Sequence, residues 1–144
     1  AGRTIRVFLG QRIDCAQCHD HLFDPRWKQS HFQGLAAFYA PTRFTSHGVD
    51  DDHGLQFEVI DHESNTSRVI VPAVPFGSEW LPTDGTPRQK LAAWLTDKRN
   101  ERFDRAIVNR VWGQMFGRPF YSPVDDLPDP GERLGWLLMA GYGS

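Results

Sequence analysis

The sequence has few cysteines and no long hydrophobic run. Its 144 residues include two cysteines and two methionines. No apolar stretch approaches the ~20 residues that a membrane-spanning helix needs. The formal net charge of −2 means that the chain lacks the basic excess that favours nucleic acid or an anionic membrane surface. We therefore expect no nucleic acid partner, and no membrane span within these residues.

Both cysteines lie in one short motif. Cys15 and Cys18 are separated by two residues, and His19 follows directly. The Cys-x-x-Cys-His spacing is typical of covalent attachment of c-type haem, in which the thiols bind the vinyl groups and the adjacent histidine binds the iron. No further cysteine competes for either thiol. The pattern therefore favours haem c as the cofactor.

Three other interpretations fit the same spacing. Cys15 and Cys18 could be a thioredoxin-type redox pair, although the βαβ context of that motif is not visible. The two thiols could also be half of a zinc site, which His19 and His21 or another histidine would complete. In the third interpretation the cysteines are buried and have no chemical role. A structural zinc or interaction domain therefore stays open beside haem binding.

The haem interpretation assigns a role to each residue of the motif. Cys15 and Cys18 are the expected thioether residues, and His19 is the expected iron ligand. A ligating histidine usually donates its second ring nitrogen, and a backbone carbonyl or Asp24 could accept that hydrogen bond. His21 is too close to His19 along the chain to reach the opposite face of the iron. A structural, hydrogen-bonded role suits His21 better.

The sequence leaves the sixth iron ligand open. Met115 is the first candidate, because it lies on the apolar face of a predicted helix and methionine ligation raises the reduction potential of haem iron. His62, another histidine or no protein ligand are the alternatives. An open iron site would allow peroxidase-like chemistry instead of electron transfer. The aromatic residues expected to line the haem are Trp27, Phe32, Phe38, Trp112 and Phe116.

The spacing of apolar residues predicts a mainly α fold with one small β-hairpin. We expect a helical haem-c-binding domain that differs from the standard small cytochrome c fold. Helices are predicted over residues 2–13, 25–39, 87–97, 103–116 and 132–140. Strands are predicted over residues 55–62 and 67–74. Residues 41–54, which include an acidic triplet, are predicted to form a loop.

The longest predicted helix carries an apolar stripe that we expect to face inward, and Gly117 should end it. Asn109 and Arg110 interrupt this stripe. They either lie on an exposed edge or need partners such as Asp125 or Asp126. The stripe comprises Phe103, Ile107, Val108, Val111, Trp112, Met115 and Phe116.

Prolines and glycines cluster between residues 72 and 88, and this composition indicates a linker. The chain is therefore divided into residues 1–80, which carry the motif and the hairpin, and residues 81–144, a helical segment that packs on them. We expect the two segments to form one folding unit that is part of a longer protein.

Two stretches of the chain resemble one known group of proteins. Residues 7–38, which include the Cys15–His19 motif and Trp27-Lys28-Gln29, are similar to the end of the planctomycete cytochrome-c-type domain. Residues 91–96, 105–118 and 123–127 are similar to the start of the planctomycete-specific domain that follows it. The resemblance implies an exported protein, in the periplasm or at the cell surface, whose activity is unknown.

Together, the motif and the resemblance predict covalent haem c binding in an electron-transfer module of an exported protein. The redox partner protein is not identified by the sequence. A peroxidase-like haem enzyme and a structural zinc or interaction domain are the alternatives.

Overall fold

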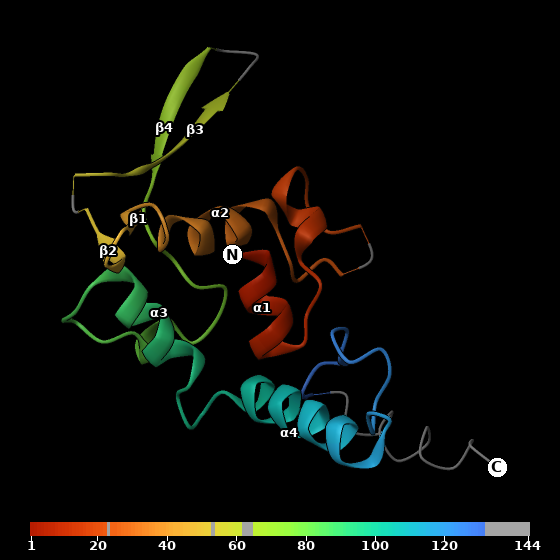
Figure 1. The fold of residues 1–144 in the computed structure, drawn as a ribbon. Coiled ribbons are helices and arrows are strands. Elements are labelled where there is room, and N and C mark those ends of the chain that lie inside the picture. Colours follow the sequence, from red (N-terminus) through yellow and green to blue (C-terminus); the bar gives the residue numbers. More distant parts are fainter. Residues whose placement is uncertain (23, 53, 62–64, 132–144) are drawn as a thin grey trace. The chain divides into compact units, whose positions relative to one another are not determined.

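The structure is a computed structural model that describes residues 1–22, 24–52, 54–61 and 65–131 (Figure 1). In these ranges the chain forms four α-helices and two antiparallel hairpins. The helices are α1 (Gly2–Leu9), α2 (Gln29–Ala37), α3 (Pro87–Leu95) and α4 (Glu101–Phe116). The strands are β1 (Thr42–Thr45), β2 (Gly48–Asp51), β3 (Phe57–Asp61) and β4 (Thr66–Ile70). Two short 3-10 helices are η1 (Asp14–Gln17) and η2 (Ser78–Trp80).

The predicted mainly α fold is wrong, because the described residues form a small domain of mixed α and β structure. About 39% of the residues are helical and about 14% lie in strands. Residues 41–54, which were predicted to form a loop, contain the hairpin of β1 and β2, which pair from Thr42↔Asp51 to Thr45↔Gly48. These strands lack the apolar alternation by which a strand is recognised. Main-chain pairing is supplemented here by ion pairs, such as that between Arg88 Nε and Asp51 Oδ1 at 2.7 Å.

The predicted hairpin over residues 55–74 is confirmed. β3 and β4 are antiparallel and pair from Phe57↔Ile70 to Asp61↔Thr66. Asn65, which directly precedes β4, has a φ of 49°. This left-handed conformation is tolerated by asparagine better than by most residues and is common in turns.

The first two predicted helices are shorter in the structure. α1 ends at Leu9 rather than at residue 13, because Gly10 adopts a φ of 62° that ends the helical geometry. α2 begins at Gln29 rather than at residue 25. The Asp24 carboxylate, which we expected to start the helix, instead accepts a hydrogen bond from the Arg26 N–H at 3.1 Å and stabilises a turn.

The two later helices agree with the prediction to within a few residues. α4 begins at Glu101 and ends at Phe116, and Gly117 follows it with a φ of 77°, as a glycine that ends a helix does. The helix predicted over residues 132–140 lies outside the described residues.

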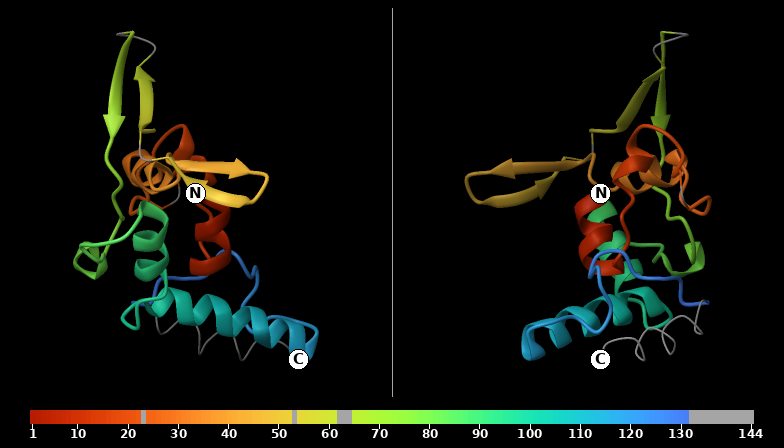
Figure 2. Two further views of the ribbon diagram at one scale, coloured as in Figure 1. Left: turned by 60° about the vertical axis from the view of Figure 1, so that its left-hand side comes forward. Right: turned by 90° about the vertical axis from the view of Figure 1, so that its right-hand side faces the viewer.

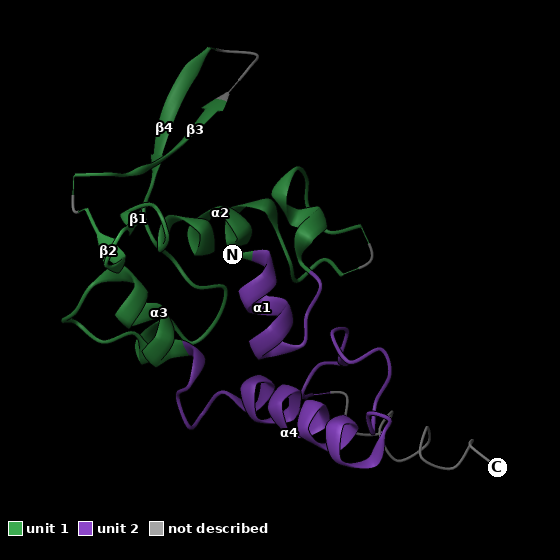
Figure 3. Ribbon diagram, viewed as in Figure 1, with its two compact units in different colours: residues 1, 13–94 green, residues 2–12, 95–144 purple. Residues whose placement is uncertain are grey.

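The chain divides into two compact units (Figure 3). Unit 1 comprises residues 1 and 13–94, and unit 2 comprises residues 2–12 and 95–144. α1 therefore groups with the C-terminal residues, although it begins the chain. The division into segments 1–80 and 81–144 stays a prediction.

An aromatic cluster forms the core of unit 1. Trp94 is fully buried, and its indole Nε1 donates to the Phe76 carbonyl at 2.9 Å. The Phe76 ring lies 4.9 Å from that of Trp94 and also contacts the rings of Trp27 and Trp80, at 6.5 and 5.9 Å between ring centroids. Both hairpins project from this helical part of unit 1 (Figure 2).

In unit 2, α1 packs against α4. The rings of Phe8 and Phe103 stack with their centroids 6.2 Å apart. Arg110 donates hydrogen bonds to the carbonyl oxygens of Arg6 and Val7, at 3.0 and 3.1 Å. The last carbonyls of a helix lack partners within it, so Arg110 satisfies two of them at the end of α1.

The segment after α4 folds back within unit 2. Asn109 is buried, donates to the Tyr121 carbonyl at 2.9 Å and accepts from the Tyr121 N–H at 2.7 Å. The proposed partners, Asp125 or Asp126, are therefore wrong, since Asn109 and Arg110 bond to backbone groups instead. Asp125 pairs with Arg12, at 2.7 Å between Nη2 and Oδ1. The sequence pattern indicated that a buried Asn109 needs a partner, but it did not indicate that the Tyr121 backbone is that partner.

Candidate functional site

The two cysteines and His19 lie on one short turn of unit 1. The backbone N–H groups of Cys18 and His19 donate to the Cys15 carbonyl at 3.2 and 3.4 Å, which closes the turn. Ile13 and Ala16 of the same segment are buried, whereas Cys15, Cys18 and His19 are exposed. The two buried side chains therefore hold the turn in place and leave the predicted attachment residues accessible.

Both thiols are free and exposed. The interpretation in which the two cysteines are buried is therefore wrong. The chemistry of the donors fits haem c, which requires two free thiols and a nearby imidazole.

The His19 imidazole has a defined partner. Its Nδ1 lies 2.6 Å from the backbone oxygen of Asp20. A carbonyl oxygen accepts hydrogen bonds only, so Nδ1 is the donor in this contact, and in the neutral imidazole the lone pair then lies on Nε2. This is the arrangement in which a histidine binds a metal through Nε2 while its other nitrogen donates to a second group. Of the two acceptors that we considered, the backbone carbonyl is the one present.

His21 is a hydrogen-bonded structural residue, which is the role that we favoured for it from the sequence. Its Nδ1 accepts from the Asp24 N–H at 3.0 Å, and its own N–H donates to the Trp27 carbonyl at 2.9 Å. These two hydrogen bonds close the loop that connects the motif to α2.

Asp24, the other acceptor considered for His19, is engaged elsewhere. Arg26 donates to both of its carboxylate oxygens, at 2.7 Å from Nε to Oδ1 and 2.9 Å from NH2 to Oδ2. Hydrogen bonding from the Arg26 side chain lowers the pKa of Asp24 below its ordinary value, which burial alone would raise. Asp24 is therefore a carboxylate held in a turn.

The candidates for the sixth iron ligand lie in different places. Met115 lies on α4 in unit 2 and is 71% exposed. His31 is part of α2, where its Nδ1 accepts from the Lys28 N–H at 3.2 Å. His47 lies between β1 and β2, with its Nδ1 3.0 Å from the Ser46 hydroxyl. His53 and His62 lie outside the described residues.

The aromatic residues expected to line the haem divide between the two units. Trp27 and Phe38 are buried in unit 1, and the Trp27 ring packs edge-on against those of His31 and Phe76. Trp112 and Phe116 lie in unit 2, where their ring centroids are 4.3 Å apart and both side chains are exposed. Haem contact by Trp27 or Trp112 stays a prediction.

Most of the apolar stripe on α4 is exposed, which corrects the inward orientation that we predicted. Val108 is 64% exposed, and Val111, Met115 and Phe116 are also exposed. The residues of α4 that are buried are Ala106 and Asn109. The stripe was misjudged because periodicity shows which face of a helix is apolar, not whether another element covers it.

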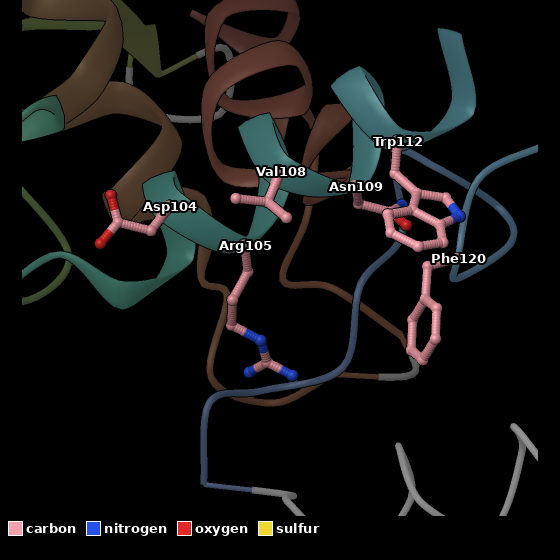
Figure 4. A pocket seen from close by; sticks show the side chains of 6 residues that line it. All are labelled: Asp104, Arg105, Val108, Asn109, Trp112 and Phe120. Carbon is pink, nitrogen blue, oxygen red and sulfur yellow. The ribbon is translucent and has the colours of Figure 1, made fainter. Parts of the chain in front are cut away.

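A hollow of about 390 Å³, which was not predicted from the sequence, lies beside this stripe in unit 2. Figure 4 shows the side chains of Val108, Trp112 and Phe120 around the hollow, with Asp104 and Arg105 at one end. The lining is largely apolar and comes from one face of α4 together with the segment that follows the helix.

The described residues contain neither a cluster of metal ligands nor a helix that could span a membrane. In the ranges that the structure describes, no three or more His, Cys, Asp and Glu side chains gather so as to hold a metal ion. Cys15, Cys18, His19 and His21 are all described and do not form such a group. Over the same ranges, no helix is long and apolar enough to span a bilayer.

Comparison with known proteins places family matches at both ends of the chain. Residues 1–44 match PSCyt2, a protein of unknown function (DUF1549), and residues 87–137 match PSD1, a protein of unknown function (DUF1553). No curated protein and no solved structure matches the chain. The matches agree with the resemblance found in the sequence at the level of the families, and the two ends of the chain are thus similar to two protein families whose activity is unknown.

Proposed function

We propose that the chain binds haem c covalently and acts as an electron-transfer module of an exported protein. The observation that supports this most directly is the arrangement at the motif. Two free, exposed thiols lie on one helical turn with His19, whose Nδ1 is held by the Asp20 carbonyl.

The chain's own residues would supply the attachment. Each thiol, from Cys15 and Cys18, would add its sulfur to one vinyl carbon of haem and its proton to the other carbon. One C–S bond forms for each S–H bond lost, so no oxidant is consumed. His19 would bind the iron through Nε2, and haem iron supplies one-electron exchange between the ferric and ferrous states.

Exposure of the motif residues is our reason for preferring electron transfer to catalysis. A peroxidase-like site needs a distal acid–base group and a shielded pocket above the iron. Cys15, Cys18 and His19 are all exposed on unit 1, and an exposed attachment turn would suit exchange of electrons with a partner protein. The proposed location is the periplasm or the cell surface, where covalent haem attachment takes place.

Met115 stays our proposed sixth ligand on the sequence argument alone, because methionine ligation raises the reduction potential of haem iron. If it binds the iron, Met115→Ala in the matured protein should convert a six-coordinate absorption spectrum to that of an open iron site. An unchanged spectrum would remove Met115 from the candidates.

Expression of the chain with the c-type maturation machinery tests the proposal. The protein should be red, and the colour should remain with the protein after acid–acetone extraction. Replacing Cys15 or Cys18 singly by Ala should leave one thioether bond, and replacing both should make all the colour extractable. Colourless wild-type protein that contains zinc would contradict the proposal.

A further inference from the structure

One residue of unit 1, Gln29, holds the chain on both sides of His19. Gln29 is the first residue of α2. Its backbone N–H donates to Asp20 Oδ1 at 2.8 Å, and its side-chain Nε2 donates to the Cys18 carbonyl at 3.0 Å. Cys18, which precedes His19, and Asp20, which follows it, therefore both accept hydrogen bonds from Gln29.

Asp20 connects these contacts to the His19 imidazole. Asp20 contributes two groups: its backbone oxygen accepts from His19 Nδ1 at 2.6 Å, and its carboxylate accepts from Gln29. Gln29 therefore bonds both to the Asp20 side chain and to the Cys18 peptide, the two groups on either side of the His19 residue whose Nδ1 contacts the Asp20 carbonyl.

Helix capping alone does not explain this arrangement. A carboxylate at the first N–H groups of a helix satisfies donors that lack partners and interacts favourably with the helix dipole, so the Asp20 contact could serve α2 alone. The Gln29 side chain, however, extends away from α2 to the Cys18 carbonyl and lies 3.4 Å from that of Gln17. That contact holds the motif rather than the helix.

We infer that Asp20 and Gln29 are positioning residues that set the orientation of the His19 imidazole for iron. The inference rests on the proposed function, since it concerns the residue proposed to bind the metal. A fixed Nδ1–H donor keeps the lone pair on Nε2 and makes the imidazole a stronger electron donor to the metal. Stronger donation stabilises ferric iron, so the two residues lower the reduction potential.

A first test uses the haem-free chain. Gln29→Ala removes the side-chain donor and keeps the backbone N–H, and Gln56→Ala is a matched control at an exposed glutamine. Nitrogen-15 NMR of the His19 ring should show the Nδ1–H tautomer in the wild type and the control. Gln29→Ala should show a mixture with the Nε2–H tautomer. An unchanged tautomer in Gln29→Ala would overturn the inference.

A second test uses the matured protein. Gln29→Ala should keep both thioether bonds, as judged by mass, while its midpoint potential shifts above that of the wild type and of Gln56→Ala. Asp20→Ala should shift the potential in the same direction. Asp20→Asn should restore most of the wild-type potential, because it retains an oxygen acceptor for the Gln29 N–H.

The outcomes separate the two claims. Equal potentials in Gln29→Ala and the wild type would contradict the positioning role and leave haem binding intact. A wild type without covalent haem would contradict the proposed function, and the tautomer measurement would still decide whether Gln29 orients His19.

Discussion

At the scale of single residues, Asp125 connects parts of unit 2 that are far apart in the sequence. Its carboxylate accepts from Arg12 at 2.7 Å and lies 3.7 Å from Arg6 Nε. The hydrogen bond from the Arg12 side chain lowers the pKa of Asp125 below its ordinary value of 3.8. A carboxylate with a lowered pKa in the folded state stabilises the fold above its unfolded-state pKa. This contribution is lost as the pH falls through the folded-state pKa.

We therefore expect Asp125→Asn to lower the free energy of unfolding at neutral pH by about 1 kcal/mol or less, because the pair is partly exposed. The variant should also lose stability less steeply than the wild type as the pH falls below about 4. Urea titrations at a series of pH values measure both effects. Asp84→Asn, at an exposed position, is the control and should follow the wild type. An Asp125→Asn profile parallel to that of the wild type would contradict this account.

The residues that lie close together were predictable where the spacing was local. The Cys-x-x-Cys-His pattern identified Cys15, Cys18 and His19 from five consecutive positions, and the structure places all three on one exposed turn. The contribution of Gln29 was not predictable, because it depends on a turn that brings residue 29 back to residues 18 and 20. No sequence rule relates those positions.

At the scale of elements, one Asp-x-Arg turn occurs twice. Asp24 with Arg26 and Asp97 with Arg99 form the same hydrogen bonds, in which the backbone N–H and the guanidinium of the arginine both donate to the carboxylate. The side-chain hydrogen bond from Arg99 lowers the pKa of Asp97 to about 2. The turn at Asp24 uses the carboxylate that would otherwise cap a helix, which explains why α2 begins later than predicted.

Two glycines that end helices provide a matched prediction. Gly10 and Gly117 both have positive φ, at 62° and 77°. A Cβ on Gly117 would meet nothing within 4 Å, whereas one on Gly10 would lie 2.7 Å from the buried Leu127 side chain. Gly117→Ala should cost about 1 kcal/mol of stability from backbone strain alone. Gly10→Ala should cost about 2 kcal/mol more, because Leu127 must move.

Denaturant unfolding of the two variants measures the difference. Equal losses would contradict the close packing of Leu127 on Gly10, where the Leu127 N–H also donates to the Gly10 carbonyl at 2.7 Å.

Elements with strong local signals were predicted well. α4, with its apolar repeat and terminal glycine, and the hairpin of β3 and β4 agree with the sequence pattern. The hairpin of β1 and β2 was missed because its residues are mostly polar and exposed, so its pairing leaves no apolar alternation.

At the scale of the whole molecule, the two units are interleaved in the sequence. α1 groups with residues 95–144, while the motif that follows it belongs to unit 1. Local periodicity predicts that a helix has an apolar face, but not which distant segment covers that face. The grouping of elements could therefore not be predicted from the sequence. The similarity to families of unknown function at both ends of the chain could be.

The central claim is that Cys15 and Cys18 carry haem in covalent linkage. Intact-mass spectrometry of the denatured chain, after expression with the c-type maturation machinery, tests it most directly. The account predicts that the chain gains the mass of one haem, and that peptide mapping assigns both thioether bonds to these two cysteines. A matured chain at its unmodified mass, or with the two thiols joined to each other, would contradict the account.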